Sequence, residues 1–215
     1  MRRPYVIIFS TATLDGKIAD PSGYSRLSCE EDFRLQHEMR ASVDAVMVGS
    51  GTVLADNPRL TVRLARGVSP LRVVVDGRLR TPPTSRVYEV PGKSVLITTL
   101  DHPLEMLRPY IERGVRVLGA GRGRVDLRRA LEELGETMGV RRVMVEGGGR
   151  LNCALISRGL VDEVRITIAP EVFGAGTGLF HGEKEGCRVQ LALHSMRMLC
   201  GGWVHLVYRP VYVFE

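Results

Sequence analysis

The feature that most constrains this fold is residues 143–151, VMVEGGGRL, in which an apolar run ends in Glu146 and three glycines follow. A run compatible with a helix then extends from Arg150 to Arg158 and stops at Gly159. This order predicts a strand, a glycine turn and a helix start. The first turn of a helix has unpaired N–H groups, and glycines let an anion approach them closely. The stretch alone fits a phosphate site with Glu146 at its mouth and a simple strand–helix connection equally well.

Strands alternate with helices along most of the chain. We expect strands at residues 4–10, 43–48, 71–76, 94–98, 115–118 and 143–145, and helices at 29–40, 101–113, 126–138 and 150–158. Strands at 161–169, 187–200 and 203–214 close the chain, after a polar turn at 13–19 and a glycine loop at 173–179 on either side of the alternating part. The pattern predicts one α/β domain spanning residues 1–215, with a mixed, mostly parallel sheet, flanking helices and antiparallel C-terminal strands.

Three helices have predicted end signals. Ser28 and Glu31 have the spacing of a capping box, in which each side chain bonds the other residue's N–H group. Asp101 is the expected N-cap of the helix that stops at Gly114. Asp126 is the expected N-cap of the following helix, which Gly139 should end.

The charge balance favours anionic small ligands. The net charge is +6, and because Lys17, Lys93 and Lys184 are the only lysines, 27 of the 30 basic residues are arginines, which suit bidentate phosphate binding. The arginines are scattered and no basic patch is interleaved with aromatics, which argues against nucleic acid. No apolar run approaches a membrane span, and the N-terminus lacks a signal peptide, so we expect a cytoplasmic protein without a membrane partner.

The cysteines do not form a metal pattern. Cys29, Cys153, Cys187 and Cys200 include no C-x-x-C pair and no zinc spacing with histidine. In a cytosolic chain such cysteines are typically free, buried thiols. We therefore expect no metal and no disulfide.

Standard phosphate motifs are absent. Each glycine pair that could open G-x-G-x-x-G lacks the third glycine, and Gly92-Lys93-Ser94 lacks the first glycine of a P-loop. Four turns rich in glycine or arginine remain, at 49–52, 77–82, 119–125 and 147–150, each directly after a predicted strand. In a parallel sheet these turns lie along one edge, where an extended dinucleotide could bind.

Six segments together resemble a known family. They are 15–19 (DGKIA), 44–49 (DAVMVG), 52–63 (TVLADNPRLTVR), 70–76 (PLRVVVD), 146–149 (EGGG) and 160–163 (LVDE). In this order they resemble the riboflavin-biosynthesis reductases, which form the C-terminal half of bacterial bifunctional deaminase-reductases and also occur as stand-alone archaeal and fungal proteins. The resemblance runs from about Tyr5 to Tyr208. It departs from the family in the late loop, where a glycine doublet is spread out as Gly174-Ala-Gly176.

The resemblance implies a dihydrofolate-reductase-like fold, a homodimer and NADPH as hydride donor. Because the sequence shows no zinc-deaminase signature, it looks like the archaeal stand-alone members. These reduce the ribosylamino side chain of 2,5-diamino-6-ribosylamino-4(3H)-pyrimidinone 5′-phosphate to ribitylamino.

The resemblance also implies roles for individual residues. Thr52 and Asp56 would contact the nicotinamide half of the cofactor, and Val125 the adenine. Arg80, in the turn after residue 76, would bind the 2′-phosphate. The full expected cofactor set is Thr52, Asp56, Leu79, Arg80, Thr81, Pro82, Val125, Gly147, Gly148, Gly149 and Arg150.

Two residues are candidates for the chemistry. Reduction of an opened glycosylamine needs stabilisation of positive charge or a proton shuttle, so Glu146 is the first candidate, against the alternative of a structural cap. Lys17 could anchor a sugar hydroxyl or a phosphate, or be a solvated turn lysine. Ser28 and Arg63 are the candidates for the substrate 5′-phosphate. His37, His181 and His194 receive no role.

Three alternatives stay open. The substrate could be the deaminated pyrimidinedione, as in bacteria, and no single residue decides between the two bases. The chain could be a dihydrofolate reductase on the same fold, although the segments DGKIA and EGGG argue against it. It could also bind nucleotides or nucleic acid without catalysis.

Overall fold

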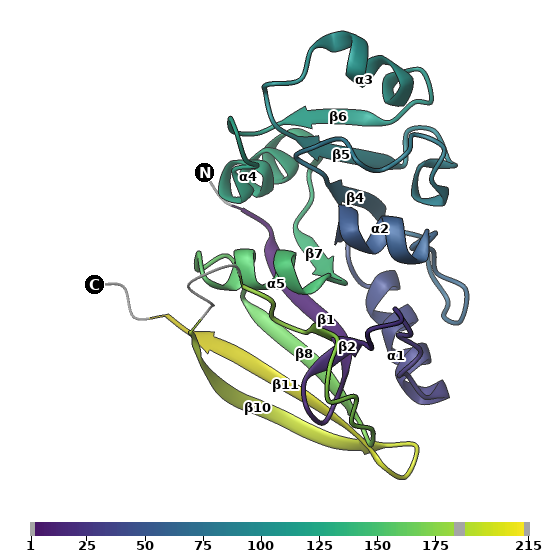
Figure 1. The fold of residues 1–215 in the computed structure, drawn as a ribbon, viewed down its shortest axis with the longest axis vertical. Coiled ribbons are helices and arrows are strands. Elements are labelled where there is room, and N and C mark those ends of the chain that lie inside the picture. The colour runs from purple at the N-terminus through teal and green to yellow at the C-terminus, as the bar shows by residue number, and fades with distance from the viewer. Residues whose placement is uncertain (1–2, 183–187, 213–215) are drawn as a thin grey trace.

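A nine-stranded mixed sheet runs through this computed structural model, which describes residues 3–182 and 188–212 (Figure 1). The strand order is β10-β11-β8-β1-β7-β3-β4-β5-β6. The bounds are β1 (Tyr5–Thr13), β3 (Ala45–Gly49), β4 (Leu71–Val75), β5 (Ser94–Thr98), β6 (Arg116–Gly119), β7 (Arg142–Val145), β8 (Glu163–Ala169), β10 (Gln190–Leu199) and β11 (Trp203–Val211). The seven strands from β8 to β6 in this order are parallel to one another. Strand β11 pairs antiparallel with β8, and β10 pairs antiparallel with β11. The predicted mixed sheet with antiparallel C-terminal strands is confirmed.

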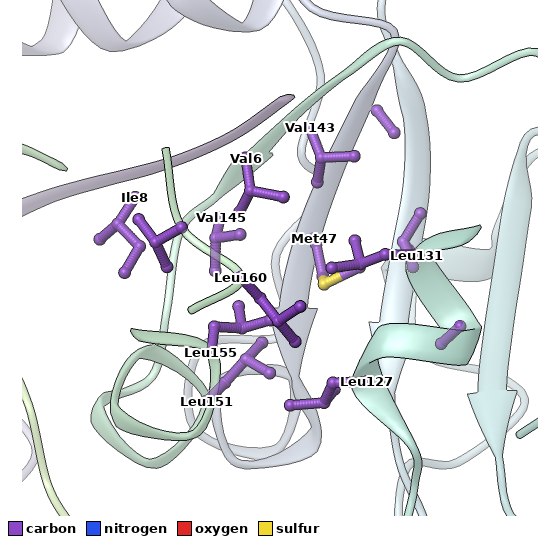
Figure 2. Packing of buried hydrophobic residues seen from close by; sticks show 14 of the residues in the cluster. Val6, Ile8, Met47, Leu127, Leu131, Val143, Val145, Leu151, Leu155 and Leu160 are labelled. Atoms are coloured by element: carbon purple, nitrogen blue, oxygen red, sulfur yellow. The ribbon is translucent and has the colours of Figure 1, made fainter. Parts of the chain in front are cut away.

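Helices cover both faces of the sheet. They are α1 (Glu30–Ala41), α2 (Ser50–Asp56), α3 (Leu104–Ile111), α4 (Leu127–Met138) and α5 (Gly149–Ile156), with a 3-10 turn at Arg86–Tyr88. Successive strand residues point to opposite faces, so Val6 and Ile8 enter one core and Ile7 and Phe9 the other. The first core packs against α4 and α5, as the side chains in Figure 2 show, and the second packs against α1, α2 and α3. No described helix is long and apolar enough to cross a bilayer.

The N-cap prediction was right for α4 and wrong for the other two helices. Asp126 caps α4 by accepting from the N–H group of Arg129, and Gly139 ends it with φ +67°. The capping box at Ser28 is wrong, because the N-cap of α1 is Cys29 and the Ser28 hydroxyl bonds that of Thr11 at 2.9 Å. Asp101 does not cap α3, whose N-cap is Pro103.

The prediction of free cysteines is also wrong. Cys29 and Cys200 form a disulfide across a sequence separation of 171 residues. The sheet order explains it, because the turn between β10 and β11 lies against the start of α1, where Trp203 Nε1 donates to Leu27 O at 2.8 Å. Cys153 is disulfide-bonded as well, whereas Cys187 lies outside the described residues.

Candidate functional site

The four predicted turns meet along the carboxyl-terminal edge of the parallel strands. The Gly49 N–H group at the end of β3 donates to Gly147 O at 2.9 Å, which joins turns 49–52 and 147–150. Arg80 Nη2 donates to Ser50 Oγ at 2.7 Å, which joins turn 77–82 to the start of α2. A Cβ placed on Gly77 would lie 3.2 Å from Val125 Cγ2, so turn 119–125 follows directly. The edge is therefore one continuous surface across β7, β3, β4 and the loop after β6.

The glycine turn between β7 and α5 is shaped by close backbone approach. Gly147 has φ +98°, and its peptide bond to Gly148 is cis. A Cβ on Gly149 would lie 2.1 Å from Gly178 O, so only glycine fits there. The Thr52 hydroxyl would lie 3.4 Å from a Cβ on Gly148. Thr52 of α2 and the expected pyrophosphate turn therefore face each other.

Asp76 organises the turn that carries Arg80. The residue is 1% exposed, and its carboxylate accepts from the N–H groups of Arg78 and Thr81 and from the Thr81 hydroxyl. Thr81 is itself 1% exposed, so its side chain shapes the turn from inside. Arg80 is exposed, and its guanidinium bonds the Ser50 hydroxyl.

Asp56 is the last residue of α2 and lies one helical turn after Thr52. Partial desolvation raises the pKa of its carboxyl above the ordinary value, although the residue as a whole remains exposed. Both side chains therefore lie on α2, whose first residues belong to turn 49–52, and this turn contacts turns 147–150 and 77–82.

Glu146 is held in a buried ion pair with Arg40 of α1. Arg40 Nε and Nη2 each donate to one carboxylate oxygen at 2.6 Å, and Gln36 Nε2 donates at 3.2 Å. Both charged side chains are 8% exposed. Burial by itself lowers the pKa of Arg40, but the adjacent Glu146 charge raises it above its ordinary value. The pair fixes α1 against the end of β7 with a bidentate, charge-assisted contact.

Arg63 lies in the same region as this pair. Arg40 Nη1 donates to Thr61 O at 3.1 Å, and the Arg63 N–H group donates to His37 Nδ1 at 2.9 Å. His37 is fully buried, and burial together with the charges of Arg40 and Arg63 lowers its pKa to about 4. His37 is therefore a neutral acceptor that fixes the backbone of Arg63 and leaves its guanidinium exposed.

Ser28 belongs to a different network. Its hydroxyl bonds Thr11, and Thr11 donates to the fully buried Asp32 at 2.6 Å. Asp32 also accepts from Thr167, which bonds His205 Nδ1 at 2.9 Å. The hydrogen bonds between described residues do not link Ser28 to Arg63, so the structure does not bring the two phosphate candidates into direct contact.

Lys17 lies in the short second sheet formed by β2 (Lys17–Ala19) and β9 (Thr177–Gly178). Lys17 pairs with Gly178, and Gly178 O closely approaches Gly149 at the start of α5. Among the described residues the Lys17 ammonium group has no hydrogen bond or ion pair. Lys17 is therefore near the glycine turn, and none of the described residues pairs with its charge.

Two residues of this site could not be identified from the sequence. Arg40 sits on the buried face of α1, and nothing in the local pattern marks it as the partner of Glu146. Asp76 has a weak signal, since an aspartate before a turn often accepts from backbone N–H groups two or more residues on. The contact of Arg40 depends on a segment distant in sequence, and the contacts of Asp76 depend on the conformation of a turn.

Comparison with known proteins finds similarity over most of the chain. The RibD C-terminal domain model matches residues 4–205. A 2,5-diamino-6-ribosylamino-4(3H)-pyrimidinone 5′-phosphate reductase from Methanothermobacter thermautotrophicus is 49% identical over 175 residues, which are 80% of each chain. RibD of Acinetobacter baumannii superposes with a TM-score of 0.84 at 26% identity, covering 97% of this chain and 58% of that one.

A more distant likeness concerns the fold alone. Dihydrofolate reductase from Enterococcus faecalis, complexed with NADP(H), superposes with a TM-score of 0.56 at 11% identity, covering 96% of each chain. The expected dihydrofolate-reductase-like architecture is thus confirmed. With the family model matching nearly the whole chain, this protein belongs to the RibD C-terminal domain family.

Proposed function

We propose that the protein reduces the ribosylamino side chain of 2,5-diamino-6-ribosylamino-4(3H)-pyrimidinone 5′-phosphate to ribitylamino, with NADPH, in riboflavin biosynthesis. The observation that carries the proposal is the line of contacts that joins four turns rich in glycine or arginine at one sheet edge. The relative that is 49% identical bears the name of this reductase. Family membership supports the reaction class, and the edge offers a place for an extended dinucleotide.

The residues at this edge fit NADPH. The cofactor carries several anionic phosphates, which need cations and free backbone N–H groups. Exposed arginines lie in or beside the turns, namely Arg78, Arg80, Arg122, Arg124 and Arg150. Within the glycine turn, Gly148 is half-buried and a Cβ there would meet only the Thr52 hydroxyl within 4 Å, so its backbone is the part that a phosphate could approach.

Each part of the cofactor has its proposed partners. Gly147, Gly148, Gly149 and Arg150 would hold the pyrophosphate, and Thr52 and Asp56 the nicotinamide half. Leu79, Arg80, Thr81 and Pro82 form the turn beside the adenosine phosphates, with Thr81 acting from inside the protein and Arg80 on the 2′-phosphate. Val125, packed on Gly77, would contact the adenine.

When bound, NADPH would supply the hydride for reduction at C1′ of the opened sugar. The protein's own part is positioning and electrostatics. Glu146 would stabilise positive charge next to C1′, with Arg40 fixing the direction of its carboxylate. Lys17 would anchor a sugar hydroxyl or the phosphate, and Ser28 and Arg63 are the proposed contacts of the 5′-phosphate.

We further propose that the protein is a cytoplasmic homodimer. Support comes from β10, whose outer edge pairs with none of the described strands and whose Leu193, Met196 and Met198 are each more than half exposed. An unpaired, apolar edge strand is a liability unless another chain covers it.

The decisive experiment is oxidation of NADPH by the purified protein with two synthetic substrates, the diamino pyrimidinone and its deaminated counterpart. We expect turnover of the diamino compound with a higher kcat/KM. A preference for the deaminated compound would assign the bacterial substrate instead. Turnover of dihydrofolate with methotrexate inhibition would identify a dihydrofolate reductase. Binding of NADPH without turnover of any of these would leave a nucleotide-binding protein.

A further inference from the structure

The carboxylate of Asp15 joins two loops that are far apart in sequence. It lies in the turn between β1 and β2 and accepts from the N–H groups of Phe173 and Gly174, at 3.1 and 2.9 Å. The Leu14 N–H group adds a bond to Glu171 O at 2.8 Å. The loop after β8 is therefore fastened to the turn after β1, at the edge of the sheet where the site lies.

The same carboxylate also acts on Lys17. Thr13 is fully buried, and its hydroxyl donates to Asp15 Oδ1 at 2.6 Å while accepting from the Lys17 N–H group at 2.9 Å. The Thr13 hydroxyl thus links the Asp15 carboxylate to the backbone of Lys17. The hydrogen bond from Thr13, together with those from Phe173 and Gly174, lowers the pKa of Asp15, so the carboxylate is charged at neutral pH.

A neighbouring aspartate shows that this arrangement is more than an ordinary turn. Asp20 accepts from the Ser22 hydroxyl and from the N–H groups of Ser22 and Tyr24, all within its own turn. The partners of Asp15 in the late loop are 158 and 159 residues away. Asp20 therefore stabilises one turn, whereas Asp15 sets the relative position of two.

The fastened loops continue to the glycine turn. The Leu179 N–H group donates to Gly16 O at 2.9 Å, and the His181 N–H group donates to Gly149 O at 3.0 Å. The segment from 173 to 181 thus spans from Asp15 to the start of α5, with Lys17 paired to it at Gly178.

We propose that Asp15 is a positioning residue for the reductase reaction: it locks the β1–β2 turn to the loop after β8 and thereby holds Lys17 beside the β7–α5 glycine turn. The inference rests on the proposed function and on the place of Lys17 within it. Asp15 itself does not contact the reacting atoms.

The test compares Asp15→Ala with Asp20→Ala in the full-length protein. Hydrogen exchange at Phe173 and Gly174 reports the lock without any need for activity, and we expect protection to be lost in the Asp15 variant alone. Steady-state kinetics should show kcat/KM for the pyrimidine lowered about tenfold, roughly the effect of one lost hydrogen bond to a charged group. Asp15→Asn, whose amide oxygen can still accept one N–H, should recover part of the loss.

A double-mutant cycle with Lys17→Ala decides whether Asp15 acts through Lys17. If it does, the double variant has about the same kcat/KM as Lys17→Ala alone. Additive losses would overturn the proposal, as would wild-type kcat/KM in an Asp15→Ala protein that has lost protection. A wild-type protein that fails to turn over the pyrimidine would overturn the proposed function, and the inference with it. The hydrogen-exchange result tests only the contact between the two loops and cannot overturn the proposed function.

Discussion

At the scale of single residues, Glu146 shows how a sequence can point to the right position without revealing its surroundings. The strand–glycine–helix pattern predicted a carboxylate at the end of β7, and the structure has it there. Its bidentate partner Arg40 lies 106 residues earlier and was invisible in the local pattern. Tertiary contacts of this kind cannot be read from spacing, because they depend on how α1 is docked.

We expect Glu146→Gln to lower turnover strongly while the NADPH Kd changes little, because the amide keeps the shape but loses the charge. It should also lower the free energy of unfolding by about 3–5 kcal/mol, since Arg40 would be left buried without its counter-charge. Steady-state kinetics, fluorescence titration and urea denaturation measure the three effects.

The double variant Glu146→Gln/Arg40→Gln separates chemistry from stability. Without a lone buried charge it should regain most of the lost stability but none of the turnover. Full turnover in Glu146→Gln would remove Glu146 from the mechanism and leave the ion pair as a structural contact.

Arg80 governs the expected choice between NADPH and NADH. A guanidinium matches the oxygens of a 2′-phosphate, and Asp76 holds the turn that presents it. Arg80→Ala should weaken NADPH binding by roughly 1.5–3 kcal/mol and leave NADH binding nearly unchanged. Titration of both cofactors measures this, with Arg113→Ala, an exposed arginine that precedes β6 at the opposite edge of the parallel strands, as the control. Equal losses for both cofactors would mean that Arg80 only supports the turn.

His37 should make stability depend on pH. Its pKa is lowered to about 4 in the folded protein by burial, so the unfolded chain binds its proton first as the pH falls. Its contribution is therefore full above about pH 6.5 and is lost as the pH falls toward 4, at up to about 1.4 kcal/mol per pH unit. His37→Asn keeps an acceptor for Arg63. Urea denaturation between pH 7 and pH 5 should show that the free energy of unfolding falls less steeply with falling pH in this variant than in the wild type. An unchanged slope would contradict this origin.

At the scale of elements, sequence patterns located the strands better than they identified the side chains that cap the helices. Buried parallel strands such as β3 and β4 are short apolar runs between glycines and polar residues. The apolar run is a direct consequence of the burial of the strand on both faces. The predicted capping side chains failed at α1 and α3, because Ser28 and Asp101 have other partners in the folded chain. Side chains that can cap a helix can equally bond a distant residue, and local spacing does not tell the two apart.

The edge strand β10 is the element that we expect to form the dimer. Met198 is 65% exposed and Met196 66%, on a strand with a free edge. Met198→Glu should place a charge in the proposed interface and convert a dimer to a monomer in sedimentation experiments. Leu104→Glu on α3, which is 60% exposed and far from this edge in Figure 1, is the control. A monomeric wild-type protein would remove the proposed dimer.

At the scale of the whole molecule, the Cys29–Cys200 disulfide ties the start of α1 to the β10–β11 turn. The prediction of free thiols was wrong because it assumed a reducing compartment, and spacing alone does not pair cysteines that are 171 residues apart. Closing so long a loop restricts the unfolded chain. The Cys29→Ser/Cys200→Ser variant should therefore lose about 2–5 kcal/mol of stability under oxidising conditions. In strong reductant, wild type and variant should unfold alike in urea, and a difference that persists there would point to lost packing instead.

The position of β1 has a consequence for how the protein is made. β1 is central in the sheet, yet its partner Arg142 in β7 follows Tyr5 by roughly 140 residues. At about 5–20 residues per second, a ribosome needs on the order of 10 s to supply that neighbour. Throughout this interval a strand with apolar residues on both faces, Val6 to Phe9, has no partner and is open to other chains. We therefore expect the yield of folded protein in cells to depend on how fast it is translated and on the chaperones that shield β1 until β7 and β8 emerge.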